Sequence, residues 1–263
     1  MTFKWRLPRR ALQFSAAALI AAPALGLGFF RGNLAAAEFL GVPLADPLAF
    51  LQALIGGRVL VLSYLGSALL VSAGYFLLGG RSFCGWICPV GLITEQGDKL
   101  SRILGRAGKG GIPLASSRWS LLLVLLTVAL TGVPLFEVLS PIGIVNRAIV
   151  FASLLPLLLP AAILLVEVLV SRRVWCRSLC PLGGFYSLLA RFSPLRVGFV
   201  EERCTHCGDC LEVCPVHEVL APSLKQGAPQ VTAGDCNRCM ACIDSCSTKA
   251  LKIDFSYKRS CTR

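Results

Sequence analysis

Charged side chains are scarce in this chain. They make up 15% of its 263 residues, whereas hydrophobic residues make up 55%, and an average globular domain carries about 25% charged residues. So few charges could not cover the surface of a soluble protein, so we expect most of the apolar side chains to face lipid. The composition therefore argues against a soluble enzyme, a disordered chain and a small disulfide-rich extracellular protein.

Acidic residues and histidines are scarcer still. The 14 acidic residues face 26 Lys and Arg, which gives a net charge of +12 and suggests a nucleic-acid partner. The basic residues, however, are unevenly distributed between the two sides of the four apolar runs described below. One side has only three of them, Arg31, Arg58 and Arg147, and the other side has the rest. This asymmetry is typical of membrane topology, so we expect no nucleic-acid partner. Because His206 and His217 lie outside the apolar runs, the sequence excludes a bis-histidine haem within a bilayer.

Four long apolar runs without charges predict transmembrane helices. They cover residues 11–30, 59–80, 119–136 and 148–166, and a helix needs about 20 residues to cross about 30 Å of hydrocarbon. The basic residues then predict a multi-pass protein of the bacterial inner membrane, with both termini in the cytoplasm. The first run could instead be a signal peptide, but its length favours an uncleaved anchor.

A Cys-x3-Cys-Pro element occurs twice in the apolar part of the chain. Phe83–Gly91 recurs as Trp175–Gly183, so we predict that residues 1–195 form a membrane all-α domain, a two-helix unit used twice. The four cysteines of these elements are candidate redox residues: Cys84, Cys88, Cys176 and Cys180. They could ligate a metal or cluster, cycle between dithiol and disulfide, or simply pack in the interior.

The carboxy-terminal part contains two cysteine runs of the bacterial ferredoxin type. Each run reads Cys-x2-Cys-x2-Cys-x3-Cys, one starting at Cys204 and the other at Cys236. In this pattern the fourth cysteine of each run ligates the other cluster. The two predicted [4Fe-4S] ligand sets are Cys204, Cys207, Cys210 and Cys246, and Cys236, Cys239, Cys242 and Cys214.

Two other readings of the cysteine runs are weaker. Zinc sites usually contain two Cys-x2-Cys pairs or histidine ligands, and disulfides are rare at a cytoplasmic location. We therefore predict that residues 196–263 form a small α+β ferredoxin domain that binds two [4Fe-4S] clusters and lies in the cytoplasm.

Clusters of this kind carry single electrons and need a donor. The chain shows no nucleotide-binding glycine fingerprint, P-loop or flavin signature, and a membrane-soluble quinol suits clusters tied to four spans. Quinol oxidation releases protons, and Glu167 is a weak candidate proton acceptor, because carboxylates within apolar segments are costly and often functional. Alternatively, Glu167 pairs with Arg172 or Arg173.

The combination of duplicated Cys-x3-Cys-Pro elements with a double-cluster tail resembles the NapH/MauN ferredoxin-type membrane proteins. These belong to the periplasmic nitrate reductase and methylamine-utilisation systems. The resemblance implies the membrane component of a quinol dehydrogenase, which draws on the quinone pool and passes electrons to an iron-sulfur partner of the NapG type and onward to a periplasmic reductase. The family pattern maps onto the four cysteines of the Cys-x3-Cys-Pro elements and the eight of the cysteine runs.

Two other functions stay open from the sequence. The chain could be a maturation factor that supplies electrons to the metal centre or cofactor of a redox enzyme, as related proteins of methylamine utilisation and copper-enzyme biogenesis suggest. It could also be an anchor that docks redox partners while its clusters serve structure.

Overall fold

The chain forms two compact units. The computed structural model describes residues 5–21, 30–32, 36–39, 42–57, 62–105, 116–150, 157–169 and 173–255. One unit, which we call the cysteine-rich unit, comprises Met1–Leu12, Gly74–Trp86 and Tyr186–Arg263, and the other, the helical unit, comprises Gln13–Ala73 and Ile87–Phe185. The predicted domain boundary between residues 195 and 196 stays a prediction.

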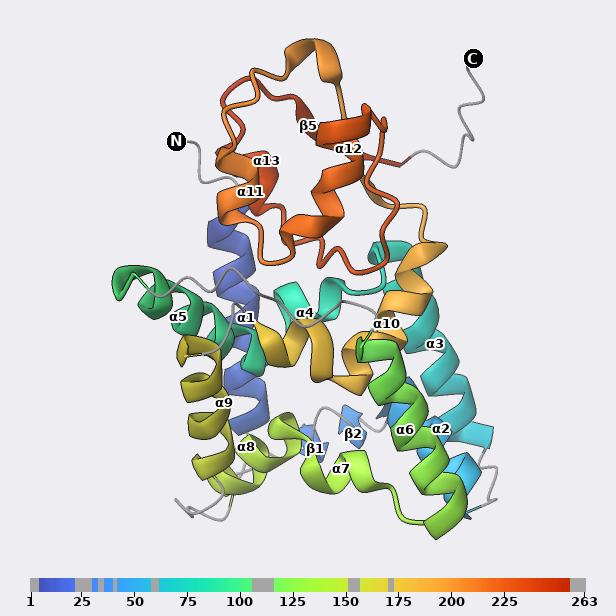
Figure 1. Ribbon diagram of the computed structural model, residues 1–263. Coiled ribbons are helices and arrows are strands. Elements are labelled where there is room, and N and C mark those ends of the chain that lie inside the picture. The colour runs from blue at the N-terminus through green and yellow to red at the C-terminus, as the bar shows by residue number, and fades with distance from the viewer. Residues whose placement is uncertain are drawn as a thin grey trace. The chain divides into compact units, whose positions relative to one another are not determined.

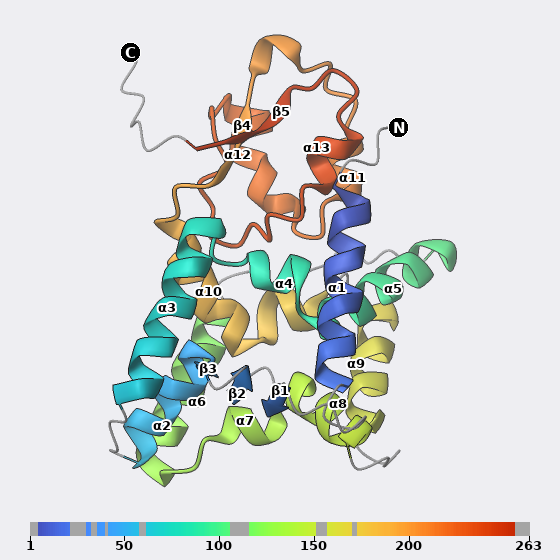
Figure 2. The ribbon, with the colours of Figure 1, turned by 180° about the vertical axis from the view of Figure 1, so that it is seen from behind.

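A two-stranded antiparallel sheet frames the carboxy-terminal part of the cysteine-rich unit. Strand β4 (Arg196–Phe199) pairs with β5 (Leu251–Asp254), with Val197 opposite Ile253, and Figure 2 shows the two strands side by side. Short helices lie between the strands in the sequence: η4 (Glu201–Arg203), α11 (Asp209–Val213), η5 (His217–Leu220), α12 (Ala221–Gln226) and α13 (Ala241–Ser245). Apolar side chains from all parts of this segment form its core, among them Val197, Val216, Leu220, Val231 and Leu251.

Earlier segments of the chain complete the cysteine-rich unit. They are the start of α1 (Arg6–Ala21), the end of α3 (Leu62–Leu78), all of α4 (Ser82–Trp86) and the end of α10 (Pro181–Arg191). The rings of Tyr75, Phe83 and Tyr186 pack together with centroids 5.0 to 5.6 Å apart. Such aromatic contacts join segments that lie more than 100 residues apart in the sequence.

The helical unit contains several short helices and a small antiparallel sheet. The helices are α2 (Pro47–Gly57), α5 (Pro89–Ile103), α6 (Ser116–Thr131), α7 (Leu135–Leu139), α8 (Pro141–Val150), α9 (Leu158–Leu169) and the π-helix η3 (Trp175–Leu179). The strands β1 (Phe30–Gly32), β2 (Ala36–Phe39) and β3 (Val42–Ala45) follow one another in the sheet. Helices α5 and α9 lie side by side (Figure 1).

Glycines allow close contacts between the helices of this unit. A Cβ atom at Gly97 of α5 would lie 3.1 Å from Leu164 Cδ1 and 3.2 Å from Glu167 Cβ, both in α9. A Cβ atom at Gly56 of α2 would lie 2.7 Å from the carbonyl oxygen of Gly132, which follows α6. The absence of a side chain at these two glycines therefore lets the helix pairs approach each other.

The predicted domain of four transmembrane helices is wrong for this structure, and so is the multi-pass inner-membrane location inferred from it. Throughout the described ranges, no helix combines the length and the apolar character required to cross a membrane. The longest, α3, has 17 residues, which at about 1.5 Å per residue span roughly 26 Å. It ends before Gly79 and Gly80, whose φ angles of 107° and 65° end the helix.

The run 119–136 is interrupted as well, whereas the runs 11–30 and 148–166 include residues 22–29 and 151–156, which lie outside the described residues. In the run 11–30, α1 ends at Ala21 and Phe30 already belongs to strand β1. In the run 119–136, Gly132 has a φ of 72° and Pro134 has no N–H to donate, so α6 and α7 are separate helices. In the run 148–166, α8 ends at Val150 and α9 begins at Leu158. Gly132 and Pro134 thus divide a run that hydropathy alone joins.

Candidate iron-sulfur site

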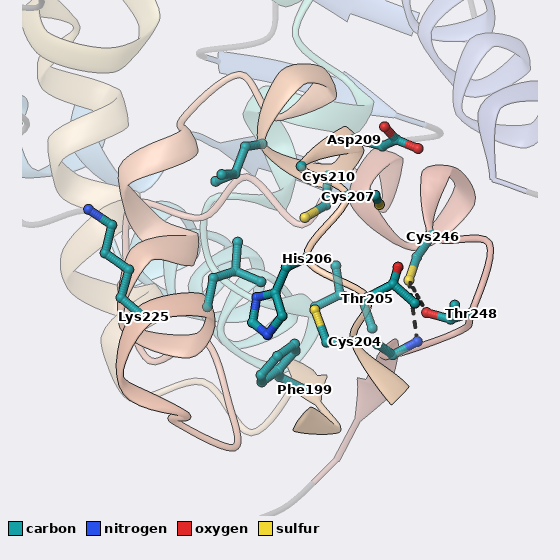
Figure 3. A pocket seen from close by; sticks show the side chains of 15 residues that line it. Phe199, Cys204, Thr205, His206, Cys207, Asp209, Cys210, Lys225, Cys246 and Thr248 are labelled. Carbon is teal, nitrogen blue, oxygen red and sulfur yellow. Dashed lines mark hydrogen bonds between the residues drawn. The ribbon is translucent and has the colours of Figure 1, made fainter. Parts of the chain in front are cut away.

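Four cysteines from two distant segments surround a cavity in the cysteine-rich unit. The cavity has a volume of about 220 Å³, and its lining includes Cys204, Cys207, Cys210 and Cys246. Figure 3 shows their sulfur atoms close to one another, with His206 and Phe199 nearby. Cys207 is exposed and the other three cysteines are half-buried, so we call this the exposed site.

The remaining four cysteines of the two runs line a second, smaller cavity. They are Cys214, Cys236, Cys239 and Cys242. Cys214 and Cys242 are each only 8% exposed, so we call this the enclosed site. In each site, three cysteines come from one run and the fourth from the other run, which is the arrangement that the sequence pattern predicts for two clusters.

The electrostatic interactions among the cysteines follow the same grouping into two sites. Burial raises the pKa of Cys210, and the neighbouring Cys207, Cys246 and Cys204 add to the rise. Burial also raises the pKa of Cys242 well above the usual value, and Cys214, Cys239, Cys236 and Cys210 contribute. Four crowded thiolates are unfavourable without a cation to neutralise them, so both sites suit a positively charged metal cluster. The effect of Cys210 on Cys242 indicates that the two sites adjoin.

Left-handed backbone conformations shape both cysteine loops at equivalent positions. In the exposed site, His206 and Gly208 have φ angles of 55° and 85°, and in the enclosed site, Arg238 and Met240 have φ angles of 48° and 60°. Residues other than glycine rarely adopt this conformation. The two loops therefore share one backbone shape, and each precedes a short helix, α11 or α13.

The sulfur atom of Cys246 has two hydrogen-bond partners, Ala250 and Thr248. The Ala250 N–H donates to Cys246 Sγ at 3.3 Å, and Thr248 Oγ1 lies 3.6 Å from it. Burial alone would raise the pKa of this thiol, but hydrogen bonds from the backbone of Leu251, Ala250 and Thr248 and from the Thr248 hydroxyl lower the pKa overall. These donors favour the thiolate, which is the form that ligates iron.

Buried polar residues around the enclosed site were not foreseen from the sequence. Arg81 donates to Asp235 Oδ1 at 3.0 Å, and the Ser187 hydroxyl donates to the same oxygen at 2.9 Å. The Trp86 indole N–H donates to the carbonyl oxygen of Arg238 at 2.8 Å. Most of these partners lie about 150 residues apart, and the only signal in the sequence is that Asp235 and Arg238 flank Cys236.

In both copies of the duplicated element, the first cysteine lies in a short helix and the second directly precedes a helix that begins with proline. Cys84 lies in α4 and is half-buried, and the buried Cys88 comes directly before Pro89, the first residue of α5. Cys176 lies in η3, and Cys180 comes directly before Pro181, the first residue of α10. Proline suits the first position of a helix because its missing N–H would have no partner there.

Hydrogen bonds hold the second copy of the element within the helical unit. Thr94 Oγ1 of α5 lies 3.6 Å from Cys176 Sγ. The Ser116 hydroxyl of α6 donates to the Ser178 carbonyl at 2.7 Å. Cys84 belongs to the cysteine-rich unit, whereas Cys88, Cys176 and Cys180 belong to the helical unit.

Glu167 lies buried next to this second copy. Its side chain is only 1% exposed, and Oε1 accepts a hydrogen bond from the Trp175 N–H at 3.0 Å. Its other oxygen, Oε2, is buried with no hydrogen-bond partner in the described part of the chain. Burial raises the pKa of Glu167 to about 7, although the Trp175 N–H and the charge of Arg173 oppose the rise. The carboxyl group can therefore gain or lose a proton near neutral pH.

Arg172 is outside the described residues, but Arg173 can be placed. Its Nη2 atom lies 3.9 Å from Glu95 Oε2. Arg173 thus forms an ion pair with Glu95 on α5, and both its charge and its backbone N–H lower the pKa of Glu167.

Family models match both cysteine-containing parts of the chain. A model described as a 4Fe-4S binding domain matches residues 60–107 and 153–199, which contain the two Cys-x3-Cys-Pro elements. A model described as a 4Fe-4S dicluster domain matches residues 196–247, which contain both cysteine runs. No solved structure matches the chain significantly.

Curated relatives match over nearly the whole chain. The methylamine utilization ferredoxin-type protein MauN of Paracoccus denitrificans is 38% identical over 89% of this chain and 84% of its own length. MauN of Methylorubrum extorquens is 37% identical over 95% of this chain and 88% of its own. The ferredoxin-type protein NapH of Escherichia coli is 33% identical over 95% of this chain and 89% of its own.

These matches confirm the resemblance that the cysteine motifs indicated. Iron-sulfur binding and electron transfer follow from the matched domains and from the names of the relatives. The chain is an electron-transfer protein with 4Fe-4S domains, and it belongs to the ferredoxin-type family that includes MauN and NapH.

Proposed function

We propose that the chain takes electrons from a quinol and passes them through two [4Fe-4S] clusters to a redox partner. One cluster would be held by the exposed site and the other by the enclosed site. The observation that carries this proposal is the pair of adjoining four-cysteine sites within one compact unit. When bound, each cluster supplies one-electron redox chemistry.

The stoichiometry of quinol oxidation suits this arrangement. A quinol that becomes a quinone gives up two electrons and two protons, and two one-electron sites together take both electrons. Because Cys207 is exposed whereas Cys214 and Cys242 are buried, the exposed site is the one that a partner protein can approach. We therefore place electron exit at the exposed site.

Glu167 is our candidate for one of the two protons. Its carboxyl group has a pKa of about 7 and a buried oxygen with no hydrogen-bond partner among the described residues. A carboxylate with such a pKa is a competent general base at neutral pH. The second proton passes to water.

The four cysteines of the Cys-x3-Cys-Pro elements are candidates for a separate redox role. Cys84, Cys88, Cys176 and Cys180 could ligate a metal or cluster, or cycle between dithiol and disulfide. The match of a 4Fe-4S binding domain to both elements favours ligation. Replacing Cys176 with Ser and measuring the iron content per chain tests this. A loss of iron supports ligation. Unchanged iron, together with the loss of a reactive thiol in a thiol titration, favours the dithiol.

For the acceptor we propose an iron-sulfur partner of the NapG type that leads to a periplasmic reductase of the nitrate reductase kind. The support is the 33% identity to NapH over almost the whole chain. A purified partner of this type should be reduced by the quinol-reduced chain. No reduction of the partner, with both clusters of the chain reduced, would exclude this route.

The test of the proposed donor is EPR spectroscopy of anaerobically prepared protein. Dithionite should produce the signals of two reduced clusters, and a reduced quinone analogue should produce part of the same signals. The Glu167→Gln variant should slow reduction by the quinol at least tenfold while dithionite reduction stays unchanged, and Glu95→Gln, on the neighbouring helix, serves as the control. Clusters that dithionite reduces and no quinol reduces would exclude the quinol donor.

A second candidate function is favoured by the relatives from methylamine utilization, at 38% and 37% identity. In this function, the chain supplies electrons for the maturation of a metal centre or cofactor in a client enzyme. A deletion strain decides between the two functions. If the client enzyme accumulates without its cofactor and the purified chain has no quinol activity, maturation is correct.

A further inference from the structure

Arg238 carries a buried positive charge at the enclosed site. Its side chain is 1% exposed, and it lines the cavity together with Cys214, Cys236, Cys239 and Cys242. The guanidinium group donates three hydrogen bonds, to the carbonyl oxygens of Cys236 at 3.0 Å, Leu195 at 3.1 Å and Ala190 at 3.4 Å. In the described part of the chain, no carboxylate pairs with it. A buried cation without an anionic partner is costly and calls for an explanation.

The fold holds this arginine in place from several directions. The Trp86 indole bonds the carbonyl of Arg238, and the residue keeps a φ of 48°. Gly79 leaves room for the arginine stem, because a Cβ atom there would lie 2.6 Å from Arg238 Cγ. These contacts fix the position of the charge beside the cysteines.

The exposed site has no comparable charge. His206 is the equivalent residue of the first cysteine loop, with the same left-handed conformation, but its side chain is exposed. Lys225 also lines the exposed site, yet it is exposed, and water and salt screen its charge. The other buried arginine near the enclosed site, Arg81, is balanced by Asp235 at 3.0 Å. The charged side chains that line the exposed site, Asp209 and Lys225, are thus both exposed, whereas the enclosed site has the buried charge of Arg238.

Burial and charge act in opposite directions on a cluster at the enclosed site. A cluster with four thiolate ligands gains negative charge when it accepts an electron, so removal of water lowers its reduction potential. A buried cation stabilises the added negative charge and raises the potential, and the low dielectric constant strengthens this effect. We propose that Arg238 raises the reduction potential of the cluster at the enclosed site, so that both clusters accept electrons from one donor. This inference rests on the proposed binding of two clusters.

Redox titration followed by EPR tests the role of Arg238. The signal of the enclosed cluster is identified as the one that Cys214→Ser removes. In Arg238→Gln, the equilibrium constant for reduction of this cluster should fall at least tenfold, which is about 59 mV for a one-electron couple, while the exposed cluster keeps its potential. Arg238→Lys keeps the charge and should stay within threefold of the wild type.

Arg196 provides a matched control. It also donates hydrogen bonds only to carbonyl oxygens, those of Ser193 and Arg191, but its side chain is partly in solvent. Arg196→Gln should leave both potentials within threefold of the wild type. Equal shifts in Arg196→Gln and Arg238→Gln, or no shift in a fully loaded Arg238→Gln, would overturn the proposal.

A variant of opposite sign keeps the test decisive if Arg238→Gln fails to assemble the enclosed cluster. Asp235→Asn removes a negative charge next to Cys236, the carboxylate that lies 3.0 Å from Arg81. The equilibrium constant for reduction of the enclosed cluster should therefore rise at least tenfold. A fall or no change in this constant would overturn the proposal. Failure of the underlying two-cluster function would look different, because the wild-type protein itself would then contain no reducible clusters.

Discussion

At the scale of single residues, the environment of an ionisable group decides its role more than its identity does. Glu167 and Glu95 lie on adjacent helices, but Glu95 is half-buried and paired with Arg173, whereas Glu167 is almost completely buried with one oxygen lacking a partner among the described residues. Burial therefore raises the pKa of Glu167 to about 7. Its position directly after an apolar run pointed to this residue, but only the structure shows that its carboxyl group is buried.

The raised pKa of Glu167 makes stability depend on pH. The folded protein binds this proton more tightly than the unfolded chain, so the group favours folding below about pH 4.5 and loses that contribution as the pH rises through about 7. In Glu167→Gln the side chain stays neutral. The variant should therefore gain stability relative to the wild type between pH 5 and pH 8, by up to about 3 kcal/mol.

Chemical denaturation at both pH values measures this difference. The exposed Glu202→Gln serves as the control and should show no pH-dependent difference from the wild type. A difference between Glu167→Gln and the wild type that is the same at pH 5 and pH 8 would show that Glu167 does not titrate in this range.

At the scale of elements, helix contacts depend on glycines at which a side chain has no room. Gly97 of α5 faces Leu164 and Glu167 of α9. A Cβ atom at Gly97 would lie only 3.1 to 3.2 Å from the side chains of these two residues. Gly97→Val should push the helices apart and lower the free energy of unfolding by about 1 to 3 kcal/mol. Gly66 of α3 has nothing within 4 Å of a Cβ atom, so Gly66→Ala should raise it by about 0.5 to 1 kcal/mol.

Thermal unfolding of the two variants measures both effects. The free energy of unfolding should fall in Gly97→Val and rise in Gly66→Ala. Both changes add side-chain volume and helix propensity, so the opposite signs reflect the space around each glycine. If Gly97→Val were as stable as the wild type, the close packing of α5 against α9 would be wrong.

The elements also show what the sequence could and could not predict. The cysteine spacing predicts two crossed ligand sets, because the ligand pattern is local and fixed by cluster geometry. The assignment of ligands stays a prediction, and the four cysteines of each set line one cavity. Hydropathy joined α6 with α7 into a single span, because a window of apolar residues is insensitive to the φ of one residue such as Gly132. The Arg81–Asp235 pair was invisible because its partners lie 154 residues apart.

At the scale of the whole molecule, the crossed use of the fourth cysteines links the two runs. Cys214 is the last cysteine of the first run but lines the enclosed site, and Cys246 is the last cysteine of the second run but lines the exposed site. Cys214→Ser should therefore abolish the EPR signal of the enclosed cluster, and Cys246→Ser that of the exposed cluster. Each should lose the iron of one four-iron cluster.

Ser247→Ala, next to Cys246 and exposed, is the control for these variants and should keep all the iron. Loss of the exposed cluster in Cys214→Ser would instead mean that each run binds its own cluster. That result would contradict the grouping of the thiols in the structure.

The most direct measurement of the central claim is the iron and acid-labile sulfide content of anaerobically purified protein, combined with zinc analysis of the same sample. Our account predicts iron and sulfide in equal amounts, equivalent to at least two four-iron clusters per chain, and little zinc. Iron and sulfide near zero with zinc in their place would contradict it.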